Sequence, residues 1–277
     1  MGECSPIIPR MKMIKNCAVL TIAGSDPGGG AGIQADLKTF SALGVYGTSV
    51  ITAVTAQNLS RVTAIQPIEP EVVRKQLLAV LEGFPINAIK TGMLFSAGII
   101  EVIAEVLSNV RHIPIIIDPV FAATTGSKLI QDEAIDRLKE KLVPLAALVT
   151  PNIPEAEILS GERLKGLQDL EKTAGKLFKR FNVPVLIKGG HLPGKATDIF
   201  FDREGVKRLE SDLIRGVNNH GSGCTLSSAI AAAMARGESL GEAISTAKTY
   251  ITRTLKDSLQ LSPDLRVMNH FPQASND

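Results

Sequence analysis

The order of apolar segments along this chain limits the folds that it can adopt. Apolar runs of strand length, among them residues 17–23, 114–118 and 183–188, alternate with stretches in which apolar residues recur at helical spacing. Such alternation is typical of βαβ units, whose parallel strands form one sheet with helices on both faces. We therefore predict an α/β fold with a doubly wound, mostly parallel central sheet flanked by helices. It would form a single domain over residues 16–277, preceded by a short disordered extension, residues 1–15.

Composition and charge narrow the classes of function. The net charge of this 277-residue chain is +2, and no basic patch is interleaved with aromatic residues, so we expect no nucleic-acid partner. The longest apolar runs have the length of strands, so we expect no membrane span. The cysteines at positions 4, 17 and 224 match neither a metal-binding spacing nor a disulfide framework, and the first residues lack the features of a signal peptide. These features predict a cytoplasmic protein.

A glycine-rich segment late in the chain is the strongest sign of chemistry. Residues 220–225 read His-Gly-Ser-Gly-Cys-Thr and continue into small and apolar residues that predict a helix. The unpaired N–H groups and the dipole at a helix N-terminus attract anions, and glycines let a phosphate approach the backbone. The same field would lower the pKa of Cys224 and make it a potential base. The pattern favours phosphoryl transfer, while an ordinary glycine-rich helix cap with a buried cysteine is the alternative.

Polar residues, glycines and one methionine follow strand after strand of the predicted sheet. Because the carboxyl ends of parallel strands meet at one edge, we expect these residues to converge on a binding site. The residues concerned are Gly24, Gln57, Met93, Asp118, Asn152 and Lys188. Two common nucleotide-binding motifs are missing, because residues 26–32 lack the G-x-G-x-x-G spacing and no G-x-x-x-x-G-K-S/T occurs.

Three of the candidate residues suit a flat, polar ring. Asp36 shares a helical stripe with apolar residues, so its carboxylate would face inward and need a donor from the protein or a ligand; a solvent-facing helix-edge Asp is the alternative. Gln57 could recognise an amine or ring amide, or be a plain surface residue. Met93 could contact the face of a ring, although core packing is the more common role of methionine.

Oxygen ligands suited to magnesium occur after two later strands. Asp118 ends an apolar strand, and Asn152 and Glu155 lie three residues apart where a strand gives way to a helix. Mg²⁺ is usually held by one or two carboxylates together with water and phosphate oxygens. The Asn-x-x-Glu spacing also fits a helix capping box, and both interpretations can hold together.

Several motifs together resemble those of the hydroxymethylpyrimidine and hydroxymethylpyrimidine phosphate kinases, members of the ribokinase-like superfamily. The motifs are Leu20–Pro27, Gly29–Phe40, Asp118–Val120, Thr150–Ala156, Lys188–His191 and His220–Ser227. They occur in the order expected for that family and extend over about residues 16–260.

The resemblance implies phosphorylation of 4-amino-5-hydroxymethyl-2-methylpyrimidine, and then of its monophosphate, by ATP with Mg²⁺ in thiamine biosynthesis. Cys224 would be the base in an anion hole made by Gly221, Ser222 and Gly223. The pyrimidine would be bound by Gly24, Asp36, Gln57 and Met93. Mg-ATP would be bound by Asp118, Asn152, Glu155 and Lys188, with Asp118 and Glu155 holding the metal through water.

The chain departs from the family pattern in one loop. Residues 121–127 read Phe-Ala-Ala-Thr-Thr-Gly-Ser, where many members have a Lys or a Ser-Gly pair, so the residue that binds the substrate phosphate stays open. Asn219 and Ser222 each replace a more usual Thr. Two other functions also stay open, a pyridoxal kinase of the same superfamily and a catalytically silent pyrimidine-binding regulator. We also expect a homodimer.

Overall fold

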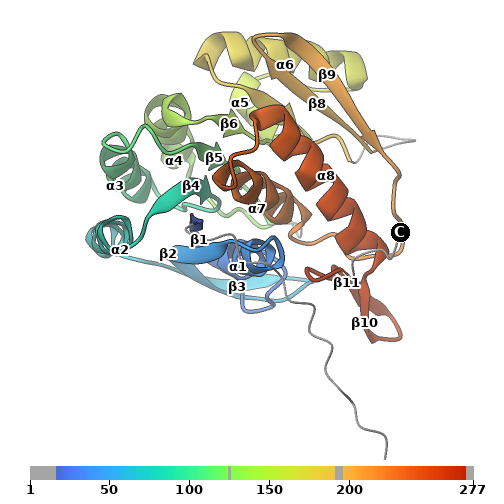
Figure 1. The fold of residues 1–277 in the computed structure, drawn as a ribbon, viewed down its shortest axis with the longest axis horizontal. Helices are drawn as coiled ribbons and strands as arrows, with labels where there is room; N and C mark the ends of the chain where they lie inside the picture. The colour runs from blue at the N-terminus through green and yellow to red at the C-terminus, as the bar shows by residue number, and fades with distance from the viewer. Residues whose placement is uncertain (1–16, 124–125, 191–195, 273–277) are drawn as a thin grey trace, which may run out of the picture.

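The central sheet determines the architecture of the domain (Figure 1). A computed structural model describes residues 17–123, 126–190 and 196–272. The strands in this part of the chain are β1 (Ala18–Ser25), β2 (Tyr46–Gln57), β3 (Val62–Pro67), β4 (Ile86–Thr91), β5 (Ile115–Ile117), β6 (Leu148–Val149), β7 (Val185–Ile187), β8 (Ala196–Asp202) and β9 (Gly205–Ser211). Their order in the sheet is β3-β2-β1-β4-β5-β6-β7-β8-β9.

The middle of this sheet is parallel and its two ends are antiparallel. The pairs from β2 through β1, β4, β5 and β6 to β7 run parallel. The edge strand β3 and the hairpin of β8 and β9 pair antiparallel. The predicted mostly parallel, doubly wound sheet is therefore confirmed.

Helices cover both faces of the sheet. One face carries α1 (Gly32–Ala42), α7 (Ser222–Ala235) and α8 (Leu240–Lys256). The other carries α2 (Pro70–Gly83), α3 (Ala97–Leu107), α4 (Asp132–Arg137), α5 (Ile153–Ser160) and α6 (Leu167–Phe181). Two hydrophobic cores fill the spaces between the helices and the sheet.

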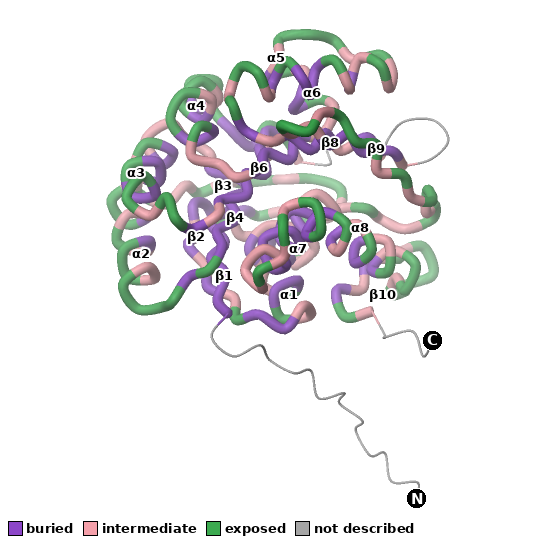
Figure 2. Tube along the Cα trace, turned by 45° about the horizontal axis from the view of Figure 1, so that its top comes forward, coloured by how far each residue is buried: buried purple, intermediate pink, exposed green. Residues whose placement is uncertain are grey.

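The composition of the elements explains this layering. The central strands β1 and β5 are buried on both sides because they consist of consecutive small and aliphatic residues. Residues 229–233 of α7 are fully buried and all but one are alanine, so this helix packs closely on the sheet. Figure 2 shows α7 as a mostly buried helix among elements with exposed outer faces. This close packing holds the beginning of α7 at the edge of the sheet.

Some boundaries differ from those that the sequence predicts. The helix predicted over 132–142 is α-helical only to Arg137, and a π-helical turn (Leu138–Leu142) and a 3₁₀ turn (Val143–Leu145) follow before Ala146. Periodicity also misses the hairpin of β10 (Leu259–Ser262) and β11 (Leu265–Val267), whose first strand is exposed and therefore has no apolar pattern. The predicted extension, residues 1–15, lies outside the described residues. None of the described helices is both long and apolar enough to cross a membrane.

Candidate active site

A cavity of about 860 Å³ lies at the carboxyl ends of the parallel strands. Its lining comes from the carboxyl ends of the parallel strands and the loops that follow them, from the first turn of α7, and from β8, α8 and the segment after β9. Residues predicted for the site that line it are Gly24, Gln57, Met93, Asp118, Asn152, Glu155, Lys188, Gly221, Ser222, Gly223 and Cys224. The expectation that polar strand ends converge on one edge is therefore met for all of these positions.

The glycine-rich turn at the start of α7 requires its glycines. Gly221 is the N-cap of α7 with a φ of 81°, a left-handed conformation that favours glycine. A Cβ atom at Gly221 would lie 1.7 Å from the carbonyl oxygen of Gly30, so two glycine-rich segments meet backbone to backbone. Among the described residues no side chain caps α7. The N-terminal N–H groups of α7 therefore border the cavity, as an anion site requires.

The prediction that the pKa of Cys224 is lowered is wrong. Burial raises the pKa of the Cys224 thiol to about 12, although the ammonium of Lys90 and an N–H of Gly32 both lower it. The carboxylates of Asp118 and Asp36 raise it further. The sequence argument considered only the helix dipole, but the loss of water around the sulfur is the larger effect. Cys224 is thus a neutral thiol that lines the cavity.

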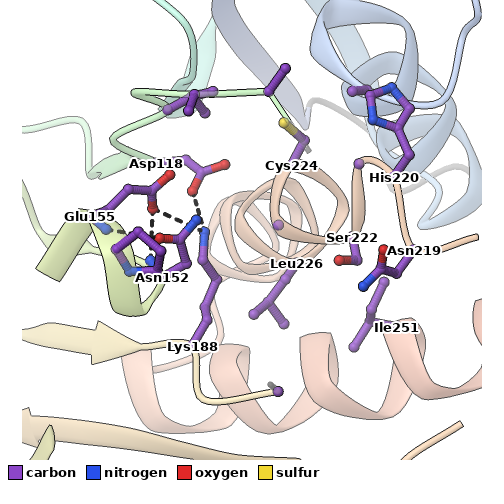
Figure 3. A pocket seen from close by; sticks show the side chains of 18 of the residues that line it. Asp118, Asn152, Glu155, Lys188, Asn219, His220, Ser222, Cys224, Leu226 and Ile251 are labelled. Atoms are coloured by element: carbon purple, nitrogen blue, oxygen red, sulfur yellow. Dashed lines mark hydrogen bonds and ion pairs between the residues drawn. The ribbon is translucent and has the colours of Figure 1, made fainter. Parts of the chain in front are cut away.

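Asp118, Glu155 and Lys188 form a group of charged side chains beside the first turn of α7, apart from Cys224 (Figure 3). Lys188 Nζ lies 2.6 Å from Asp118 Oδ1 and 3.9 Å from Glu155 Oε2. Burial alone would raise the pKa of Asp118, but the ammonium groups of Lys188 and Lys90 outweigh it and hold that pKa below its usual value. A Cβ at Gly223 would lie 3.0 Å from Lys188 Nζ, so this ammonium is close to the glycine-rich turn.

Asn152 and Glu155 form the capping box that their spacing allows. The Asn152 side chain accepts from the N–H of Glu155 at 2.9 Å, and Glu155 Oε2 accepts from the N–H of Asn152 at 2.7 Å. Burial raises the pKa of Glu155 to about 7, although Lys188 lowers it. Both residues still line the cavity, so the capping role leaves the binding role possible.

The donor set fits magnesium only as an ion that accompanies a nucleotide. No group of three or more His, Cys, Asp or Glu side chains that could hold a metal occurs among the described residues. Asp118 and Glu155 are two carboxylates near one ammonium at the cavity wall. Mg²⁺ typically uses one or two carboxylates and completes its shell with water and phosphate oxygens, so these two residues fit.

The other half of the cavity holds three of the four residues predicted for the pyrimidine. Gly24, Gln57 and Met93 line it, and a Cβ at Gly24 would lie 2.9 Å from Met93 Sδ, so a larger residue would displace that methionine. The Gln57 carboxamide also helps to lower the pKa of Asp26. Met93 is buried at 6% exposure, with its thioether beside Gly24. An apolar wall and a carboxamide are thus close together there.

Asp36 does not line the cavity, which corrects the prediction that it contacts a ligand. Its side chain is fully buried and pairs with Lys90 at 2.9 Å. Its two oxygens also accept hydrogen bonds from Thr21 and Ser228. The prediction that its carboxylate faces inward holds, but its donors come from the protein itself.

Two residues of the motifs, to which the sequence analysis assigns no role, join the two glycine-rich segments. Asp26 accepts hydrogen bonds from the N–H groups of Gly28, Gly30 and Ala31, and its Oδ2 lies 3.0 Å from Nε2 of His220. Burial alone would raise the pKa of Asp26, but these hydrogen bonds lower it to about 2. An Asp before a Pro-Gly-Gly-Gly run is a signal for such a loop. Its partner 194 residues away could not be found from the sequence.

Comparison with known proteins identifies the family. A family model described as phosphomethylpyrimidine kinase matches residues 26–269. The chain belongs to the phosphomethylpyrimidine kinase family. The family resemblance inferred from the glycine-rich motifs is therefore confirmed.

Individual members of the phosphomethylpyrimidine kinase family are similar over nearly the whole chain. The thiamine biosynthesis bifunctional protein ThiED of Geobacter sulfurreducens is 47% identical over 260 residues, which cover 94% of this chain and 53% of that protein. The chain thus spans about half the length of this bifunctional relative. The hydroxymethylpyrimidine/phosphomethylpyrimidine kinase of Rhizobium meliloti is 45% identical over 258 residues, which cover 91% of this chain and 96% of that protein.

A solved structure shares the fold. The ADP complex of a Bacillus subtilis pyridoxal kinase superposes with a TM-score of 0.85 and is 38% identical. The match covers 92% of this chain and 98% of that chain. The phosphomethylpyrimidine kinase family and this pyridoxal kinase thus have one architecture, and the residues in the cavity must distinguish their substrates.

Proposed function

We propose that this protein transfers the γ-phosphoryl group of ATP to the hydroxymethyl group of 4-amino-5-hydroxymethyl-2-methylpyrimidine, and then a second phosphoryl group to the resulting monophosphate. The diphosphate product would serve thiamine biosynthesis. Membership of the phosphomethylpyrimidine kinase family supports the substrate. The single observation that carries the reaction is the one cavity that the glycine-rich turn and Cys224 line together with Gln57 and Lys188.

The glycine-rich turn and Lys188 would stabilise the phosphoryl group in transfer. The first N–H groups of α7 and the Lys188 ammonium border the same part of the cavity, near Gly223. Phosphoryl transfer leaves mainly positioning and charge stabilisation to the protein. Asp118 and Glu155 would hold Mg²⁺ through water, and this ion supplies positive charge to the phosphate oxygens when bound.

The far end of the cavity suits the nucleotide base. Apolar side chains there come from α8 and from the segment after β9: Leu213, Ile214, Ile251 and Leu255. A purine ring can lie between such side chains while its phosphates point toward Lys188. We therefore expect ATP to bind on the side of β7, β8 and α8.

The pyrimidine would occupy the half of the cavity beside β1, β2 and β4. The carboxamide of Gln57 can both donate and accept hydrogen bonds in the plane of the ring, and Met93 offers an apolar contact to its face. The hydroxymethyl group would then point toward Cys224, which we propose as the acceptor of its proton. This role requires the thiol to lose its own proton after the ligands bind, a step that the Lys90 ammonium favours.

A coupled assay of ADP release with three substrates tests this function. We expect turnover with hydroxymethylpyrimidine and with its monophosphate in the presence of Mg-ATP. The similarity to the pyridoxal kinase of Bacillus subtilis makes pyridoxal the second candidate substrate. Turnover with pyridoxal alone would replace the proposal with that activity. Binding of labelled pyrimidine without turnover of any substrate would support a regulator instead.

A further inference from the structure

A fully buried ion pair lies behind the site, and the mechanism above uses only the positive charge of its lysine. Lys90 on β4 and Asp36 on α1 both have side chains with 0% exposure, and Lys90 Nζ lies 2.9 and 3.0 Å from the two Asp36 oxygens. Thr21 Oγ1 on β1 donates to Asp36 Oδ2 at 2.6 Å. Ser228 Oγ on α7 donates to Asp36 Oδ1 at 2.7 Å. One carboxylate therefore links four elements of the fold.

Stability alone is a weak reason for such a pair. The removal of two charges from water costs about as much as their attraction returns, and apolar residues of similar volume are often as stable. The surrounding core is made of aliphatic side chains such as Val19, Ala88 and Leu226, which would pack against an apolar pair equally well. The presence of two charges in this core therefore points to a role in function.

The pair lies directly behind the glycine-rich turn. Ser228 follows Cys224 by one helical turn, so the two side chains point to the same face of α7. A Cβ at Gly92 would lie 2.9 Å from Lys90 Nζ, and the next residue, Met93, lines the cavity. Lys90 and Asp36 both act electrostatically on Cys224. Neither of them lines the cavity, so they can affect the reaction only through other residues.

A second lysine–carboxylate pair contacts the same helix from the nucleotide side. Ser227 Oγ lies 3.4 Å from Asp118 Oδ2, and Asp118 pairs with Lys188. Consecutive serines of α7 thus contact two carboxylates, each with its own lysine. One pair faces the cavity, and the other is enclosed in the core on the pyrimidine side.

We propose that Asp36 and Lys90 are positioning residues for phosphoryl transfer, which hold Cys224 and the glycine-rich turn in place through the hydrogen bond from Ser228. This inference rests on the proposed function, because it concerns the same catalytic turn. Asp36 would thus act on the reaction through Ser228, and not through the contact with the pyrimidine that the sequence predicts.

The variant Ser228→Ala tests the link while it leaves the ion pair intact. We expect kcat to fall about tenfold, because a hydrogen bond to a charged group is lost where the helix must be placed accurately. KM for ATP and for the pyrimidine should stay within about twofold, since no cavity-lining group is removed. The matched control is Thr254→Val, which removes a buried helical hydroxyl of α8 that bonds only its own helix backbone. Its kcat should stay within about twofold of wild type.

Hydrogen–deuterium exchange of residues 219–228 gives a readout that needs no turnover. Exchange there should be faster in Ser228→Ala than in wild type and unchanged in Thr254→Val. Unchanged exchange and unchanged kcat in Ser228→Ala would overturn the inference. If the wild type phosphorylates none of the substrates, the proposed function fails, and the exchange comparison still decides the positioning role.

A double variant tests the charges themselves. Asp36→Asn with Lys90→Met removes both charges together and leaves an amide that can still bond Thr21 and Ser228. We expect kcat at least about tenfold below wild type, with both KM values unchanged. A double variant with wild-type kcat would show that the pair is structural only and overturn its functional role. Should this variant fail to fold, Ser228→Ala and the exchange measurement carry the test.

Discussion

At the scale of single residues, the environment of Cys224 gives its thiol a higher pKa than its position in the sequence predicts. A cysteine at a helix N-terminus ordinarily has a lowered pKa, but in this protein burial raises it to about 12. Lys90 is the largest of the influences that lower the pKa. The loss of water around the sulfur therefore outweighs the position at the helix N-terminus.

The first prediction concerns the role of Cys224. General-base catalysis contributes about 10²–10⁴-fold, so Cys224→Ala should lower kcat by an amount in that range. KM for ATP should stay near the wild-type value, because the residues that we propose for the nucleotide are other than Cys224. Steady-state kinetics with hydroxymethylpyrimidine measure both constants. An unchanged kcat would assign the proton to another group and leave Cys224 with a packing role.

The second prediction concerns recognition of the pyrimidine by Gln57. Removal of a hydrogen-bonding partner in an enclosed pocket costs about 1–3 kcal/mol, because the opposite group is left unpaired. Gln57→Ala should therefore raise KM for the pyrimidine by about tenfold or more and leave KM for ATP nearly unchanged. Gln57→Glu is the matched control for size. If KM for ATP rose instead, the assignment of the pyrimidine and of ATP to the two halves of the cavity would have to be reversed.

At the scale of elements, the start of α7 is held by segments from all over the chain. The α1 and β4 residues contact it through Asp36, and β5 contacts it through Asp118. The last described segment does so as well, because His270 Nε2 lies 3.2 Å from Thr225 Oγ1. Tyr250 on α8 donates to the carbonyl of His270 at 2.7 Å and holds that segment in place. The helix that carries the glycine-rich turn is thus fixed on several sides.

The third prediction is a pH dependence of stability caused by His270. Burial lowers the pKa of His270 to about 4 from 6.5. Between these values the unfolded chain binds a proton that the folded protein does not, so the free energy of unfolding falls as pH decreases through this window. The shift corresponds to about 3 kcal/mol. Denaturant unfolding at pH 7 and pH 5 should show about 2 kcal/mol of this loss, because pH 5 lies inside the window, and His270→Gln should reduce it.

Comparison of the wild type with His270→Gln isolates the contribution of His270 to the pH dependence of the free energy of unfolding. Glu155 acts with the opposite sign, because its pKa of about 7 means that the folded protein binds the extra proton between 4.5 and 7. The pKa of Asp26 is about 2, so this group matters only at more acidic pH. Both effects are present in wild type and in His270→Gln and cancel in the difference. An equal pH dependence in both proteins would contradict the prediction.

At the scale of the whole molecule, one end of the sheet exposes apolar side chains. On β2, α2 and the residue after α2, these are Tyr46, Val54, Val72, Leu78 and Phe84. The rings of Tyr46 and Phe84 stack with centroids 5.9 Å apart, although both are about half exposed. Tyr46 and Phe84 thus form an exposed apolar pair, and exposed apolar groups that lie together often mark an interface between proteins.

The fourth prediction is that this surface forms a homodimer, which the sequence analysis also expects. Sedimentation should give twice the chain mass of 29.5 kDa. Tyr46→Glu should weaken the dimer, because it places a charge among apolar side chains. Leu261→Glu on the exposed strand β10 is the control and should leave the mass unchanged. A wild-type protein that sediments as a monomer would contradict the prediction.

The amino-acid sequence determined the architecture of this protein and the positions of most residues in its cavity. Apolar periodicity is a local property, so it predicted the alternating strands and helices, and the shared edge of a parallel sheet then brought Asp118, Asn152 and Lys188 together. The tertiary structure alone decided the environment of each group. Asp36 meets Lys90 at 54 residues' separation and Ser228 at 192, and the burial of Cys224 depends on equally distant elements. The ion pairs and the burial of these side chains depend on which distant segments pack together, and a local sequence pattern cannot predict that packing.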